Sequence, residues 1–135
     1  MTARSLQKFP IHLGKGASAV SQPEFPADER AMQWYMDYGE RHADDGTEGR
    51  LVSMFTFTEN WPTWEMHPLG EEVVVCTSGR MVLTQEFPDG KSQQVTLEAG
   101  DYVINPRGVW HTADIENEAT GVFITSGAGT ENRPR

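Results

Sequence analysis

Apolar and polar residues alternate in short runs through most of the chain beyond residue 50. Because successive side chains of a strand point to opposite faces of a sheet, this period of two predicts strands rather than helices. The predicted strands cover residues 51–57, 64–67, 72–77, 80–87, 92–97, 102–104, 110–115 and 121–125. Residues 88–90, Pro-Asp-Gly, separate two of them and have the composition of a hairpin turn. Many short strands divided by turn residues indicate an all-β antiparallel sandwich or barrel.

The first 49 residues follow a different pattern. Residues 1–25 contain two prolines and two glycines, and predict an extended arm with one short strand at residues 11–13. A helix is predicted over residues 26–38, since proline and acidic residues occupy its first turn, and Gly39 weakens its continuation. Residues 43–49 are polar and predict a loop. We expect residues 1–49 to pack on a barrel of residues 50–126, and the polar, glycine-containing tail 127–135 to be disordered.

Length and charge restrict the possible partners. A chain of 135 residues is about the size of one domain and can bury roughly two thirds of its unfolded surface. The formal net charge is −9 and the sequence pI is near 4.8. Nucleic-acid or anionic-membrane binding relies on clustered Lys and Arg, so neither partner is expected. The lone Cys76 cannot form an internal disulfide, and no apolar run is long enough to cross a membrane, so we expect a cytoplasmic protein.

Two histidines and a carboxylate lie beside turn-forming residues in the strand-rich part of the chain. His67 precedes Pro68 and is followed five residues later by Glu72, and His111 comes shortly after Gly108. Imidazole nitrogens and carboxylate oxygens are common ligands of divalent transition metals. The pattern therefore suggests one shared metal site.

The surrounding residues resemble the two sequence motifs of the cupin family. The positions that match are His67, Glu72 and Gly79 in the first motif, and Gly100, Pro106, Gly108 and His111 in the second. Three positions depart from the motifs: Glu59 stands for the leading glycine, Glu65 for the first histidine and Ile115 for the final asparagine. The resemblance covers about residues 59–115 and implies a double-stranded β-helix, the jelly-roll barrel of that family, with the site inside it.

Strand alternation helps to choose the ligands. Glu65 and His67 are two residues apart, so their side chains share a face, and if Glu72 faces inward then Glu71 faces outward. Together with the resemblance, this gives a metal-ligand set of Glu65, His67, Glu72 and His111. Two imidazoles with two carboxylates suit Fe(II), Mn(II), Zn(II) or Ni(II). The family implies three histidines and one glutamate, so the extra carboxylate here favours the harder ions Mn(II) and Fe(II).

Three functions are consistent with such a site. The first is a metal-dependent enzyme acting on a small organic molecule, either an oxygenase-type oxidoreductase or an isomerase, with two open positions on the ion. The second is a non-catalytic small-molecule sensor or binding module. The third is a metal-free epimerase or lyase in which His67 or His111 is the base and Glu65 or Glu72 its charge partner. Edge-strand pairing is common in the family, so we expect a homodimer in which the N-terminal arm covers a neighbour's sheet edge.

The remaining candidates have plainer interpretations. His12 and His42 lie in the arm and the loop, and solvation or local hydrogen bonding is expected of both. Cys76 is expected to pack as a small buried side chain. Three tryptophans flank the motifs: Trp61, Trp64 and Trp110. We expect them to pack in the core or at the barrel rim, and the alternative is that they stack on an aromatic substrate.

Overall fold

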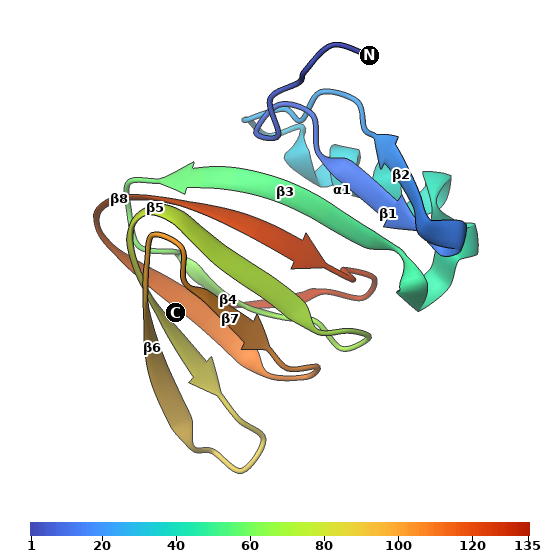
Figure 1. Cartoon of the computed structure of the whole chain (residues 1–135). Coiled ribbons are helices and arrows are strands. Elements are labelled where there is room, and N and C mark those ends of the chain that lie inside the picture. The colour runs from blue at the N-terminus through green and yellow to red at the C-terminus, as the bar shows by residue number, and fades with distance from the viewer.

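The computed structural model describes all residues, 1–135, and contains nine strands, one α-helix and two short 3-10 helices (Figure 1). The barrel elements are β3 (Arg50–Phe57), β4 (Thr63–Met66), β5 (Glu72–Glu86), β6 (Ser92–Glu98), β7 (Tyr102–Asn105), β8 (Trp110–Thr125) and β9 (Glu131–Pro134). Before them come β1 (Ile11–Gly14), η1 (Lys15–Ala17), β2 (Ser18–Ser21), α1 (Ala31–Arg41) and η2 (Ala43–Glu48). No helix is long and apolar enough to cross a membrane.

Two long bent strands, β5 and β8, form the frame of the barrel. They pair antiparallel from Glu72 opposite Thr125 to Glu86 opposite Trp110, with register shifts near Cys76 and Gly79. The sequence predicted two separate strands in each of these regions, 72–77 with 80–87 and 110–115 with 121–125. They are continuous because the irregularities around Gly79 bend the ladder without ending it, as β-bulges do.

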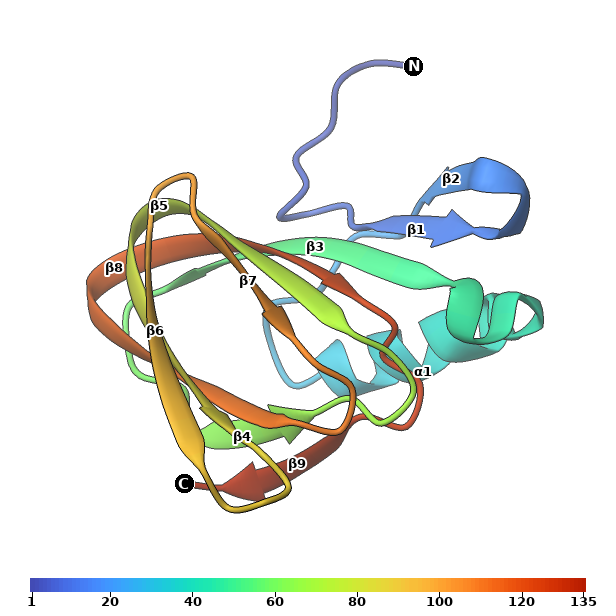
Figure 2. The same cartoon turned by 60° about the horizontal axis from the view of Figure 1, so that its bottom comes forward.

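The bend places the two halves of β5 and β8 in different layers. In one layer the strand order is β2-β1-β3-β8-β5-β7, built on the first half of β5 and the second half of β8. In the other layer the order is β9-β4-β8-β5-β6, built on the remaining halves. Figure 2 shows the strands as two facing walls joined by these bends. The expected double-stranded β-helix is therefore present.

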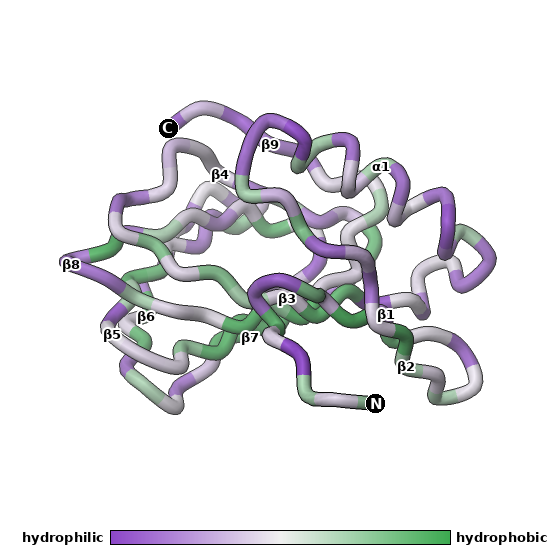
Figure 3. The backbone as a smooth tube through the Cα atoms, turned by 90° about the horizontal axis from the view of Figure 1, so that it is seen from above, coloured by the Kyte–Doolittle hydropathy of each residue, from purple (hydrophilic) through white to green (hydrophobic).

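The hydrophobic core lies between the two walls. Its buried residues are Val74, Cys76, Met81, Leu83, Leu97, Ala113, Ile115, Ala119 and Phe123. Alternation explains the set, since Val74 and Cys76, or Met81 and Leu83, are two residues apart on β5 and share its inner face. Figure 3 shows hydrophobic stretches along these strands, while β9 is hydrophilic.

The N-terminal residues pack on this chain's own barrel. Strand β1 pairs with β3 and with β2, so the arm extends one edge of its own sheet. Helix α1 begins at Ala31, five residues later than predicted, because Asp28 holds the preceding turn by accepting the backbone N–H of Arg30 at 2.9 Å. The helix continues through Gly39 to Arg41.

The C-terminal tail differs from its prediction. Residues 127–135 were expected to be disordered, but Glu131–Pro134 form strand β9, which pairs antiparallel with β4. Backbone hydrogen bonds and arginine contacts hold it, so the segment needs no apolar side chains of its own. The guanidinium of Arg135, for example, lies 2.8 Å from a carboxylate oxygen of Asp114. Two charged residues that suggest a solvated tail, Arg133 and Arg135, therefore form ion pairs with Glu86 on β5 and Asp114 on β8.

Candidate metal centre

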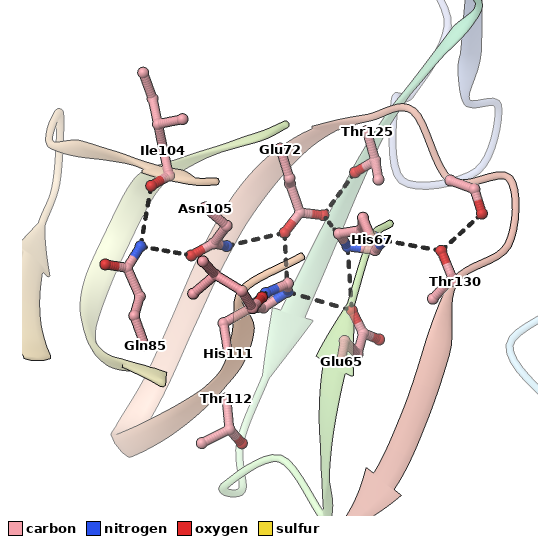
Figure 4. Close-up of polar contacts among 12 residues, drawn as sticks. Glu65, His67, Glu72, Gln85, Ile104, Asn105, His111, Thr112, Thr125 and Thr130 are labelled. Carbon is pink, nitrogen blue, oxygen red and sulfur yellow. Dashed lines mark hydrogen bonds and ion pairs between the residues drawn. The ribbon is translucent and has the colours of Figure 1, made fainter. Parts of the chain in front are cut away.

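The structure brings the four predicted ligands together at one point of the barrel (Figure 4). Glu65 lies on β4, His67 directly follows that strand, Glu72 begins β5, and His111 lies near the start of β8. One potential ligand atom from each residue lies within 4.8 Å of all the others. Residues distant in the sequence therefore converge because β8 pairs with both β4 and β5.

Glu72 is at the centre of this cluster. Its Oε1 lies 3.2 Å from Nε2 of His111, and its Oε2 lies 3.3 Å from Nε2 of His67. Oε2 of Glu65 is more distant, at 3.8 Å from His111 and 3.9 Å from His67. Glu72 and both histidines are buried, while the Glu65 side chain is 35% exposed. Glu71 is exposed, as the alternation predicted.

The carboxylate of Glu72 is held from both sides by its neighbours on adjacent strands. Asn105 of β7 and Thr125 of β8 are both register partners of Glu72. The Asn105 side-chain amide donates to Oε1 at 3.1 Å, and the Thr125 hydroxyl donates to Oε2 at 2.6 Å. Gln85 donates in turn to Oδ1 of Asn105 at 2.9 Å, which fixes the orientation of that amide. Each Glu72 oxygen thus has a fixed donor on one side and a histidine on the other.

Each histidine directs Nε2 toward the cluster and uses Nδ1 elsewhere. Nδ1 of His67 lies 2.8 Å from the Thr130 hydroxyl, and Nδ1 of His111 lies 3.4 Å from the Val109 carbonyl. Both Nε2 atoms are buried and have no hydrogen-bond partner, although a Glu72 oxygen lies 3.2 or 3.3 Å from each. Buried polar atoms without a partner are rare in folded proteins. A cation between the histidines and carboxylates would satisfy both, so the donor set fits a divalent metal.

Burial and charge act in opposite directions on the ionisable groups. Burial alone would raise the pKa of Glu72, but the facing His111 and His67 outweigh it and hold that pKa well below its usual range. Burial alone would lower the pKa of His111, but Glu65 and Glu72 outweigh it and raise the pKa to about 9. Burial, with the charges of Glu65 and Glu72, also raises the pKa of Tyr35 on α1 to about 12. The helix therefore lies within electrostatic reach of the cluster.

Four supporting residues were not found from the sequence: Gln85, Asn105, Thr125 and Thr130. Asn105 directly precedes Pro106 of the second motif, and its place next to a matched position was the only available signal. Thr125 could have been found only from the register of β5 against β8. Thr130 lies in the tail predicted to be disordered, and no sequence motif marks it.

A second group, His12, His42 and Asp45, also brings potential ligand atoms close together. Its nitrogens already have partners, since Nε2 of His12 lies 2.6 Å from Asp45 and Nδ1 lies 2.6 Å from the Tyr38 hydroxyl. The rings of His12 and His42 stack with their centroids 3.8 Å apart and their planes only 14° from parallel. The lone pairs in the two ring planes therefore run side by side and do not point at one ion. This is a hydrogen-bonded network, in agreement with the expected local bonding.

The tryptophans have packing roles. Trp61 lies against Phe57 and Phe123 at the core and is 6.2 Å from the His111 ring, centroid to centroid. The rings of Trp64 and Trp110 both lie against the guanidinium of Arg133, at 5.0 and 4.5 Å. Cys76 is buried in the core, as expected.

Comparisons with known proteins agree with the fold. A family model described as Cupin domain matches residues 57–127, which include all four clustered residues. A search of curated proteins found no match. An oxalate oxidase structure is 21% identical, with a TM-score of 0.54 over 64% of this chain and 48% of that chain. The chain thus spans about half the length of this solved structure.

Other solved structures show how far such likeness extends. The Mn(II)-containing oxalate decarboxylase of Bacillus subtilis is 16% identical, with a TM-score of 0.54 over 71% of this chain and 26% of that chain. Peruvianin-I, described as a cysteine peptidase from Thevetia peruviana latex, is also 16% identical, with the same TM-score over 63% of this chain and 56% of that chain. Proteins with such different descriptions share this fold, so the likeness establishes architecture and not activity.

Proposed function

The chain belongs to the cupin family, and on that premise we propose that Glu65, His67, Glu72 and His111 bind one divalent transition-metal ion in the barrel. The observation that carries the proposal is the pair of buried, unpartnered Nε2 atoms that face two carboxylates. With both imidazoles neutral, the two carboxylates balance the charge of a divalent ion. Two hard carboxylate oxygen donors in place of one favour Mn(II) or Fe(II) over Zn(II) or Ni(II).

We infer that the bound ion serves chemistry on a small organic molecule with oxygen donors, of the oxygenase or isomerase type. A divalent ion held by these four residues would supply a Lewis acid that polarises substrate oxygen atoms. The protein's part is to present both Nε2 lone pairs and to hold the Glu72 carboxylate between Asn105 and Thr125. Glu65 reaches the site from a more exposed position, with 35% of its side chain accessible to solvent.

The deciding experiment is metal analysis of protein purified without chelator, before and after adding Mn(II) or Fe(II). We expect close to one equivalent, abolished by His111→Ala and retained by His42→Ala, whose histidine lies outside the cluster. Less than about a tenth of an equivalent, with no gain on addition, would overturn the proposal. Catalysis retained in fully chelated protein would favour the metal-free acid–base function instead, for which the charged Glu72 and His111 pair is the supporting observation.

We also propose a homodimer, formed through an exposed edge strand. Strand β7 pairs only with β5 and exposes Tyr102 and Ile104, at 65% and 46%. An exposed apolar edge invites pairing with a second copy. Light scattering should report a dimer for the native chain and a monomer for Ile104→Lys. A monomer at all micromolar concentrations of the native chain would contradict this proposal.

A further inference from the structure

The C-terminal strand β9 is the principal ladder partner of β4, the strand that carries Glu65 and leads into His67. The β4–β9 register joins Glu65 to Asn132 and Met66 to Glu131, whereas β4 pairs with β8 only where Glu65 lies opposite His111. Figure 2 shows β9 lying along β4 at the edge of its layer. The position of β4 therefore depends on a segment that lies outside residues 57–127 of the family match.

Arginine contacts hold β9 against the barrel. The Arg133 guanidinium lies between the rings of Trp64 on β4 and Trp110 on β8. Arg135 reaches Asp114 on β8 at 2.8 Å, with 30% of its side chain exposed. The two cation–π contacts of Arg133 are each worth about 0.5–1 kcal/mol at such partly exposed sites. Together, the Arg133 and Arg135 contacts hold the C-terminal segment against β4 and β8.

The turn before β9 brings the Thr130 hydroxyl within hydrogen-bond distance of His67, a proposed metal ligand (Figure 4). Oγ1 of Thr130 donates to the Gly127 carbonyl at 2.7 Å, and a carbonyl can only accept. The hydroxyl has one hydrogen, so at its second contact, 2.8 Å from Nδ1 of His67, it must accept. In the neutral ring the proton then lies on Nδ1, and Nε2 keeps the lone pair directed at the cluster.

We propose that Thr130 is a positioning residue of the metal centre, through which the C-terminal segment selects the metal-binding tautomer of His67. The inference rests on the proposed function, because it concerns one of the proposed ligands. His111 has a weaker restraint, since its Nδ1 lies 3.4 Å from the Val109 carbonyl. The Thr130 hydroxyl is thus the shorter and better-defined of the two contacts that orient an imidazole. Loss of such an outer partner typically weakens metal affinity by about 10–100-fold.

Two substitutions separate the hydroxyl from the rest of the side chain. Thr130→Val removes the acceptor and keeps nearly the same volume, while Thr130→Ser keeps the hydroxyl and removes the methyl group. The dissociation constant for Mn(II), measured by calorimetry on the full chain, should rise about 10–100-fold in Thr130→Val and stay within about threefold of wild type in Thr130→Ser. An unchanged constant in Thr130→Val, or an equal loss in both variants, would overturn the inference.

A second measurement keeps this result separate from the proposed function. Nitrogen NMR of the chelated protein reports directly which ring nitrogen of His67 carries the proton. We expect Nδ1–H in wild type and Thr130→Ser, and a shift toward Nε2–H in Thr130→Val. If wild type bound no metal, the proposed function would fail, and the tautomer would still show whether Thr130 controls His67. A wild-type His67 protonated at Nε2 would overturn the inference by itself.

Discussion

Glu65 and His111 lie directly opposite each other in the ladder between β4 and β8, with Oε2 of Glu65 3.8 Å from Nε2 of His111. The carboxylate occupies the position at which the family's first motif has a histidine. It therefore brings a second negative charge to the cluster, opposite a buried imidazole. The partly exposed Glu65 is the one member of the cluster that water can reach easily.

Replacing Glu65 should change both the strength and the preference of metal binding. Outer-shell partners are worth about 10–100-fold in affinity, so losing a direct carboxylate ligand in Glu65→Ala should weaken Mn(II) binding by about 100-fold or more. Glu65→His restores three imidazoles and should shift the preference from Mn(II) toward Zn(II) or Ni(II). Competitive titration measures both effects, with the exposed Glu59→Ala as control. Equal Mn(II) affinity in Glu65→Ala and Glu59→Ala would show that Glu65 is not a ligand.

Glu72 and Glu71 form a matched pair of neighbours with opposite environments. Removing one partner of a buried charge pair typically costs 3–5 kcal/mol, so Glu72→Gln should destabilise the chelated protein by about 3 kcal/mol. Glu71→Gln changes an exposed side chain and should stay within about 0.5 kcal/mol of wild type. Urea unfolding of the chelated proteins gives both values. Similar losses in the two variants would be incompatible with the role of Glu72 as the buried charge.

Alternation was sufficient to predict most strands and the inward direction of Glu72, because one buried face imposes a period of two. It could not predict that β5 and β8 are each one continuous strand. Glycine usually weakens a strand, but the irregularity near Gly79 bends the β5–β8 ladder without ending it. Alternation could not predict the polar strand β9 either. Its stability comes from partners on β4 and from Trp64 and Trp110, and these contacts exist only in the folded chain.

The four clustered residues were predictable because motif spacing and alternation agree on them. Their supporting residues were not, because Asn105, Thr125 and Thr130 are defined by register and by the path of the tail. A threonine at a strand end can be solvated, can form a local hydrogen bond or can contact a site residue. Only the fold shows that Thr125 contacts a carboxylate and Thr130 an imidazole. Local patterns thus located the proposed ligands, while long-range pairing determined what orients them.

The His42 network should make the N-terminal unit sensitive to acid. Arg41 donates to the Gln22 side-chain oxygen at 2.8 Å, so the Gln22 amide nitrogen donates to Nε2 of His42 at 2.9 Å. Protonation of Nε2 would remove that acceptor and leave His42 only the longer contact to the Gln22 side-chain oxygen, at 3.2 Å, which Arg41 already occupies. Burial, then the charges of His12 and Arg41, lower the pKa of His42, although Asp45 opposes them.

The sign of the pH effect follows from that shift. A histidine with a lowered pKa binds fewer protons in the folded than in the unfolded state, so its contribution to stability is complete above about pH 6.5 and declines as the pH falls below it. Urea unfolding between pH 5 and 8 should show a steeper loss toward acid in wild type than in His42→Gln. Identical pH profiles would show that His42 does not titrate differently on folding.

Gly79 and Gly90 allow backbone strain to be separated from steric contact. Both have positive φ, +74° and +84°, but a Cβ on Gly79 would lie 2.0 Å from the Glu118 carbonyl oxygen, whereas one on Gly90 would meet nothing within 4 Å. Gly90→Ala should cost only the left-handed conformation, about 1–2 kcal/mol. Gly79→Ala must also move the backbone of β8, so it should cost at least about 2 kcal/mol more, or prevent folding. Urea unfolding of the two variants measures the difference, and equal losses would mean that the β5–β8 contact at Gly79 yields without cost.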